Sequence, residues 1–297
     1  MPLSPAPLAS ESAPPPVLTP SILALRAGLT VLRAVQSSVP GQAGAALRRA
    51  ARLDLEDAER AVEAEINAYR ERLRTSPDTV EVVDYGAGSD RPPVRAVADI
   101  YRGAATGPAW GRFLFGLARG LRPRRVLELG TNLGVGAAHL AGALTLNEAE
   151  GAGGRLVTLE GAPALAERAR QGLASLGHTL GLDGRVEVVV GPFAETLPGV
   201  LEAGPFDLVF VDGHHRADAA LDYLEVLEPA LAGGAVIVLD DVEPGRDVRR
   251  AWRALREDGR AATGIYVVKY GIFVHRPPRQ GAATPSARES LSDPIRA

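Results

Sequence analysis

Between residues 122 and 242, five short strand-like runs alternate with segments of helical periodicity, and this alternation restricts the fold more than any other feature. The runs are RRVLEL (124–129), RLVTLE (155–160), RVEVVV (185–190), FDLVFVD (206–212) and AVIVLDD (235–241). Strands that alternate with helices form a parallel sheet covered by helices on both faces. The sequence therefore predicts an α/β protein with a doubly wound, mostly parallel seven-stranded sheet, completed by a hairpin from 265–269 and 272–275.

Helical periodicity is present both between and before these runs. Between the runs and after the last one we expect helices over about 136–146, 163–176, 217–231 and 245–256. Upstream, apolar residues recur every three or four positions and predict two more helices, over 21–38 and 43–74. These N-terminal helices pack against the main domain or against a second subunit, in which case the chain forms a homodimer.

Composition divides the chain into four parts. We expect a disordered Pro-rich tail (1–20), a helical N-terminal extension with a lid or substrate segment (21–120), the α/β domain (121–276) and a second disordered tail (277–297).

Charge and residue usage exclude several classes of function. The 297 residues include 33 basic and 36 acidic side chains, so no global basic field attracts nucleic acid. Cysteine is absent, which excludes disulfides, thiolate zinc sites and cysteine nucleophiles and leaves oxygen or imidazole ligands for any metal. No apolar run approaches the roughly 20 residues of a membrane span. We expect a cytoplasmic protein that binds neither nucleic acid nor membrane.

The first strand-like run ends in a glycine-rich turn, ELGTNLGVG (128–136). A dinucleotide-binding fingerprint needs glycine at the first, third and sixth positions, but the third and sixth are Asn132 and Val135. The turn therefore suits a ligand without pyrophosphate, or it only reverses the chain. It resembles the nucleoside-binding turn of class I S-adenosylmethionine-dependent methyltransferases. That resemblance implies four cofactor-binding residues here: Glu128, Gly130, Thr131 and Gly134.

A second acidic strand end supports a ligand at this turn. RLVTLE ends at Glu160, whose carboxylate can accept two hydrogen bonds from ribose hydroxyls. A similar pattern of strand, acid and glycines occurs at Val80–Asp90, but no strand ending in an acid follows it until Glu128. We therefore expect the cofactor at Glu128 and interpret Tyr85–Ser89 as a lid or substrate-side element.

Acidic residues and two histidines follow the last two runs of the expected parallel sheet. Asp212 is followed by His214 and His215, and the last run ends in Asp240 and Asp241. Neighbouring parallel strands bring these groups to one rim, where clustered carboxylates need a cation, solvent or mutual pairing. Oxygen-rich sites suit magnesium, calcium or manganese. The alternative is that the acids cap the helices that follow.

From Arg125 to Val242 the chain resembles the catechol O-methyltransferase-like branch of these methyltransferases, with VLELG, RLVTLE, DLVFVD and VIVLDDV in matching order. Over about Asp84–Arg276 it is more similar to a bacterial group with a DYGAGS-type segment and a DGxH motif. The resemblance implies a Rossmann-like methyltransferase fold and S-adenosylmethionine as cofactor.

Residue by residue, the same resemblance implies roles at the strand ends. It implies three metal ligands, for Mg²⁺ or another divalent cation: Asp212, Asp240 and Asp241. It assigns catalysis to Asp212 and to His215, which stands where the family often carries a lysine base. It places five cofactor contacts beyond the turn: Glu160, Gly191, Phe193, Asp212 and His214. Asp241 departs from the family's usual asparagine, and imidazole suits proton abstraction near neutral pH.

We therefore expect an S-adenosylmethionine-dependent methyltransferase that methylates a hydroxyl of a small molecule, with assistance from a divalent metal. Two alternatives are a nicotinamide-dependent oxidoreductase on a similar sheet and a non-catalytic S-adenosylmethionine-binding protein. The loops do not identify the acceptor as a phenol, a sugar hydroxyl or an amine.

Overall fold

A computed structural model describes residues 39, 41–52, 54–83, 93–182, 184–212, 225–240, 261–267 and 270–276. Six expected segments lie wholly or mostly outside these residues: the tails 1–20 and 277–297, the helices at 21–38, 217–231 and 245–256, and Tyr85–Ser89. Of the helix expected to end at residue 231, the described part is one short turn that leads into a 3-10 turn, Glu228–Ala230.

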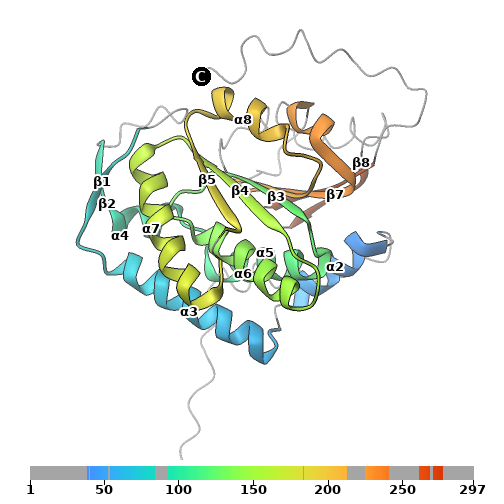
Figure 1. The fold of residues 1–297 in the computed structure, drawn as a ribbon, viewed down its shortest axis with the longest axis horizontal. Helices are drawn as coiled ribbons and strands as arrows, with labels where there is room; N and C mark the ends of the chain where they lie inside the picture. The colour runs from blue at the N-terminus through green and yellow to red at the C-terminus, as the bar shows by residue number, and fades with distance from the viewer. Residues whose placement is uncertain are drawn as a thin grey trace, which may run out of the picture.

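The centre of the fold is a seven-stranded sheet in the order β5-β4-β3-β6-β7-β9-β8. Its strands are β3 (Arg125–Leu129), β4 (Arg155–Glu160), β5 (Val186–Val190), β6 (Phe206–Val211), β7 (Leu231–Leu239), β8 (Ala261–Val267) and β9 (Tyr270–His275). Strands β3 to β7 pair in parallel, whereas β9 pairs antiparallel with both β7 and β8. The predicted α/β class, the mostly parallel sheet and the terminal hairpin are confirmed (Figure 1).

Helices cover both faces of this sheet, and the central strands β3 and β6 are accordingly buried along almost their whole length. They are α4 (Val97–Ala104), α5 (Pro108–Leu121), α6 (Val135–Ala149), α7 (Pro163–Leu180) and α8 (Phe193–Leu201). Helices α5, α6 and α7 lie on one face and α8 on the other (Figure 1). None of the described helices combines the length and apolarity needed to cross a bilayer.

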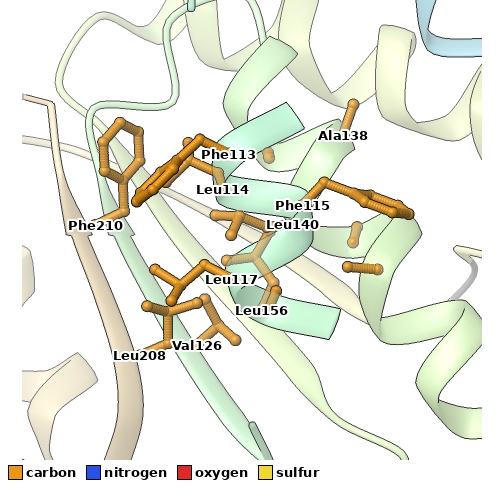
Figure 2. Packing of buried hydrophobic residues seen from close by; sticks show 14 of the residues in the cluster. Phe113, Leu114, Phe115, Leu117, Val126, Ala138, Leu140, Leu156, Leu208 and Phe210 are labelled. Carbon is orange, nitrogen blue, oxygen red and sulfur yellow. The ribbon is translucent and has the colours of Figure 1, made fainter. Parts of the chain in front are cut away.

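Successive residues of each strand point to opposite faces, which assigns β3 residues to two cores. Val126 belongs to the core beneath α5 and α6, and Leu127 belongs to the core beneath α8. In Figure 2, Phe113 of α5 points toward Phe210 of the sheet. Glu128, two residues after Val126, therefore lies on the α6 face, and this register determines how its carboxyl acts below.

The N-terminal helix predicted over 43–74 is wrong as a single element. The structure has two helices, α2 (Gly41–Arg52) and α3 (Asp57–Arg74). A capping box explains the break. The Glu59 side chain accepts a hydrogen bond from the backbone N–H of Glu56 at 3.0 Å, and the Glu56 side chain accepts one from the backbone N–H of Glu59, the third helical residue. The chain then forms an antiparallel pair, β1 (Thr79–Glu81) with β2 (Val94–Ala96).

The two N-terminal helices pack within the chain rather than standing apart from it. On α5, Gly116 and Gly120 allow close approach of α2, because a Cβ at Gly116 would lie 3.0 Å from Cα of Ala50, and one at Gly120 would clash with Ala46. Helix α3 contacts α4, α6 and α7 and contributes Ile66 to the same buried cluster as the sheet. One core therefore joins the helical extension to the α/β domain.

Candidate active site

The glycine turn lies directly beyond β3 and is held by the neighbouring strand. The backbone N–H groups of Gly130 and Thr131 both donate to the Leu159 carbonyl, at 2.9 and 3.0 Å. Gly130 has φ of 101° and Gly134 has φ of 75°, values in the left-handed region that glycine favours. Gly134 is also the N-cap of α6. The turn thus runs from the end of β3 into a helix N-terminus, as its sequence predicts.

Glu160 ends β4 beside this turn, and its carboxylate already accepts hydrogen bonds from the backbone. The N–H of Asn132 donates to Oε2 at 2.7 Å, and the N–H of Ala162 donates to Oε1 at 3.0 Å. Burial raises the pKa of Glu160, although the hydrogen bonds from Ala162, Asn132 and Gly161 oppose that rise. Because each carboxylate oxygen has two lone pairs, both oxygens can still accept a ribose hydroxyl.

Glu128 lies below the turn, in the protein interior. Its side chain is 1% exposed, and Oε2 accepts a 2.6 Å hydrogen bond from the Thr158 hydroxyl. The Thr131 hydroxyl lies 2.6 Å from the same Thr158 hydroxyl, so a buried chain of three side chains supports the turn from beneath. Burial raises the pKa of Glu128 to about 8, and the nearby charge of Glu160 acts in the same direction. Oε1 of Glu128 faces Cα of Gly136 in the first turn of α6.

The backbone places Asp212 and Asp240 at adjacent strand ends. Val211 of β6 is paired with Leu239 of β7, so the aspartates occupy equivalent positions one residue later. The N–H of Asp212 donates to Leu129 O at 2.8 Å, and the N–H of Asp240 donates to Val211 O at 2.8 Å. Both side chains are half-buried. This part of the sequence-based placement is therefore present in the backbone.

The remaining members of the predicted metal and base set lie outside the described residues. These are His214, His215 and Asp241. Within the parts of the chain that the structure describes, no group of three His, Asp or Glu side chains forms a metal site. The roles of these three residues therefore stay predictions from sequence.

The turn after β5 borders Glu160 from the other side. The N–H of Gly191 donates to Glu160 O at 3.0 Å, and Gly191 has φ of 139°. Phe193 begins α8 two residues later and is half-buried. Both residues thus lie at the strand edge where the sequence predicts the adenine.

Two side chains of α3 hold the turn and its neighbouring segment and were not anticipated from the sequence. The Tyr69 hydroxyl donates to Leu133 O at 2.5 Å, and Arg70 Nη2 donates to Thr106 O at 2.7 Å. A signal for Arg70 was available, because it is in phase with Ile66 on the apolar face of its helix, where a charged residue requires an explanation.

Comparison with known proteins agrees with this arrangement. A protein-family model described as a methyltransferase domain matches residues 127–242. The chain is 45% identical over 137 residues to catechol O-methyltransferase of Mycobacterium tuberculosis, covering 46% of this chain and 56% of that protein. It is 35% identical over 140 residues to catechol O-methyltransferase of Niastella koreensis, covering 46% and 57%. The chain thus spans little more than half the length of these two relatives.

A solved structure supports the fold independently. The S-adenosylhomocysteine-bound methyltransferase of Podospora anserina superposes with a TM-score of 0.50 at 21% identity, covering 75% of this chain and 88% of that one. At this identity the similarity establishes the shared fold alone.

Proposed function

We propose that this chain is a class I S-adenosylmethionine-dependent methyltransferase and that it methylates a hydroxyl group of a small molecule. The observation that carries the proposal is the half-buried Glu160 carboxylate, which lies against the Gly130–Gly134 turn at the carboxyl edge of the sheet. The similarity to two catechol O-methyltransferases supports oxygen as the methylated atom.

The residues at the turn fit the cofactor. Glu160 has acceptor capacity for ribose hydroxyls, and the positive φ angles of Gly130 and Gly134 permit close backbone approach to a ligand. Gly191 and Phe193 border the adenine in this proposal. When bound, S-adenosylmethionine supplies an electrophilic methyl carbon, whose bond to sulfur breaks as the bond to the acceptor oxygen forms, leaving S-adenosylhomocysteine. The protein positions the two reactants in line.

The strand ends would serve the acceptor. Asp212 and Asp240 place two oxygen donors at adjacent positions, and Asp241 would add a third, a donor set that suits Mg²⁺. A divalent ion there lowers the pKa of a coordinated hydroxyl. We propose that His215 removes the hydroxyl proton while His214 lies near the adenine. The metal, the base and the acceptor are parts of the proposal that rest on sequence position.

Two alternatives receive less support. A nicotinamide-dependent oxidoreductase conflicts with Asn132 and Val135 at the fingerprint's glycine positions. A protein that only binds the cofactor has no need for acidic side chains at adjacent strand ends, where like charges repel. The relatives described above are methyltransferases, which favours neither alternative.

Methyl transfer from isotopically labelled S-adenosylmethionine to a panel of catechols, phenols, sugars and amines, with and without EDTA, tests the proposal. We expect labelled methyl ethers, and loss of turnover in EDTA that Mg²⁺ restores. Asp212→Asn should abolish turnover but retain cofactor binding, whereas Asp99→Asn, which removes an exposed carboxylate of α4 paired with Arg102, should behave as wild type. Full activity of Asp212→Asn would overturn the assignment of the metal site. Labelled amines without labelled ethers would overturn oxygen as the methylated atom.

A further inference from the structure

Arg70 of α3 is a buried arginine with an unsatisfied donor group. The residue is 5% exposed; Nη2 donates to Thr106 O, and the guanidinium carbon lies 5.9 Å from the centroid of the Tyr101 ring. Its second terminal nitrogen, Nη1, is buried and has no hydrogen-bond partner. Within the described residues, no carboxylate pairs with Arg70. A buried guanidinium without an anion is unfavourable, so this site is incomplete as it stands.

The other buried arginine of this region differs in this respect. Arg119 is 8% exposed, and its guanidinium donates to Glu59 at 2.9 Å and to Glu150 at 2.5 Å. The half-exposed Arg112 likewise donates to Glu63 at 2.9 Å. The chain therefore provides carboxylates where an arginine serves only to join helices. Among the described residues Arg70 has no such partner, so its guanidinium can accept an anion supplied by a ligand.

The unsatisfied donor lies beside the glycine turn. The segment 104–106 separates the two: Arg70 holds its Thr106 carbonyl, and Asn132 Nδ2 donates to the Ala104 carbonyl at 3.3 Å. A Cβ placed on Gly136, just after the turn, would lie 3.2 Å from Thr106 Oγ1 and would clash with Glu128 Oε1. Thr106 thus connects Arg70 to the first turn of α6.

An unsatisfied acceptor lies on the same segment. Asn132 Oδ1 is buried and makes no hydrogen bond. The unsatisfied donor of Arg70, from α3, and the unsatisfied acceptor of Asn132, from the turn, therefore lie on either side of residues 104–106. A ligand that complements both must carry an anionic acceptor and a separate donor.

We propose that Arg70 Nη1 binds the carboxylate at the amino-acid end of S-adenosylmethionine. This inference rests on the proposed function. The cofactor carries one anionic group, and it belongs to an α-amino acid whose ammonium supplies the donor that Asn132 Oδ1 lacks. Glu160 on β4 would hold the ribose, and Arg70 on α3 would hold the opposite end. The helical extension then forms part of the cofactor site and selects ligands that retain the carboxylate.

Calorimetric titration with two ligands tests the inference: S-adenosylhomocysteine and its decarboxylated analogue, which lacks only the carboxylate. Arg70→Gln should weaken the affinity for S-adenosylhomocysteine by about tenfold to a hundredfold, the usual effect of losing a charge-assisted hydrogen bond. Affinity for the decarboxylated analogue should stay at the wild-type value. Arg74→Gln, which removes an exposed arginine of the same helix paired with Glu71, should change neither affinity.

Arg70→Lys keeps the positive charge and replaces Arg70→Gln in this test if the glutamine variant fails to fold. We expect it to weaken the affinity for S-adenosylhomocysteine by less than Arg70→Gln does, and to leave the affinity for the decarboxylated analogue unchanged. Equal weakening of both ligands in either variant would show that Arg70 only supports the fold, and unchanged affinity for both would remove any role in binding. If the wild-type protein binds neither ligand, the proposed function itself fails, and the inference fails with it.

Discussion

The hydroxyl of Tyr69 donates a 2.5 Å hydrogen bond to the backbone carbonyl of Leu133, and this contact joins the N-terminal helix α3 to the turn that begins α6. Gly172 on α7 leaves the space for it, since a Cβ there would clash with the Tyr69 hydroxyl. Tyr69 precedes the segment that matches the methyltransferase family, so a side chain outside that segment fixes the conformation of the cofactor turn.

Tyr69→Phe should loosen the turn while leaving its helix packed. Loss of the hydroxyl leaves Leu133 O without this donor, so we expect the free energy of unfolding to fall by about 1 kcal/mol and cofactor affinity to fall with it. Urea unfolding and calorimetry measure the two effects. Tyr101→Phe is the control, because it removes a phenolic hydroxyl from α4 and keeps the ring that lies beside Arg70; equal effects in both variants would contradict the prediction.

Glu128→Gln should change how stability depends on pH. Burial raises the pKa of Glu128 from 4.5 to about 8, so the folded protein retains a proton that the unfolded chain releases between those values. The free energy of unfolding therefore falls as pH rises through this range, by about 1.4 kcal/mol for each unit of difference in pKa. Glutamine does not ionise and can still bond to Thr158, so the variant should gain stability relative to wild type from pH 5 toward pH 8.

Urea titrations of both proteins at several pH values give the difference in unfolding free energy directly. Glu187→Gln, at an exposed position on β5, is the control: its unfolding free energy should differ from that of wild type by the same amount at every pH. A constant difference between Glu128→Gln and wild type would show that Glu128 ionises in the folded protein as it does in solution.

Glu160→Gln should weaken binding of S-adenosylhomocysteine, because an amide has one oxygen where the carboxylate offers two to Asn132, Ala162 and the ribose. Since burial raises the pKa of Glu160, wild-type affinity should begin to fall on acidification at a higher pH than for an ordinary glutamate. The variant should lack this decline. Calorimetry between pH 5 and 8 provides the measurement, and an unchanged affinity at every pH would remove the ribose role.

Gly136→Ala should destabilise the protein although alanine is the better helix former. Its Cβ would clash with Glu128 Oε1 and lie 3.2 Å from Thr106 Oγ1, and such overpacking costs about 1–3 kcal/mol. Gly103→Ala in α4 is the matched control: nothing lies within 4 Å of its Cβ, so the change should stabilise by about 0.5–1 kcal/mol. Thermal unfolding should shift in opposite directions for the two variants.

Glu59→Gln should be among the most damaging single changes in α3. Glu59 is 1% exposed and binds both Arg49 and Arg119. Without its charge, the buried Arg119 guanidinium keeps only the half-exposed Glu150 as a charge partner, so we expect the free energy of unfolding to fall by about 1–3 kcal/mol. Glu71→Gln breaks an exposed ion pair with Arg74 on the same helix and should have no measurable effect on the urea midpoint. Similar midpoints for the two variants would contradict the buried network.

The sheet could be predicted from sequence because its strands carry the signal locally. Buried parallel strands are continuous apolar runs, and the acids that end them, such as Glu160 and Asp212, mark the carboxyl edge without any knowledge of pairing. The glycine turn was recognisable for the same reason. Each of these features lies within a few consecutive residues.

The features that the sequence did not reveal either have a short or weak local signal or depend on contacts between distant segments. Apolar spacing alone did not show the break before α3, because it is caused by a capping interaction between Glu56 and Glu59. The strands β1 and β2 are three residues each, too short for a periodic pattern. The burial of Arg70 follows from its neighbours in α4 and the glycine turn, whose positions only the folded chain defines.

The shared core has a consequence for the solubility of shortened chains. Phe113 and Leu117 of α5 cover Leu208 and Phe210 of the sheet, and they precede the family-matched segment 127–242 (Figure 2). A chain that began at the matched segment would expose to water the apolar part of this face that α5 covers, which favours aggregation. Expression of residues 127–242 in isolation should therefore yield insoluble protein unless the helices from α2 onward are retained.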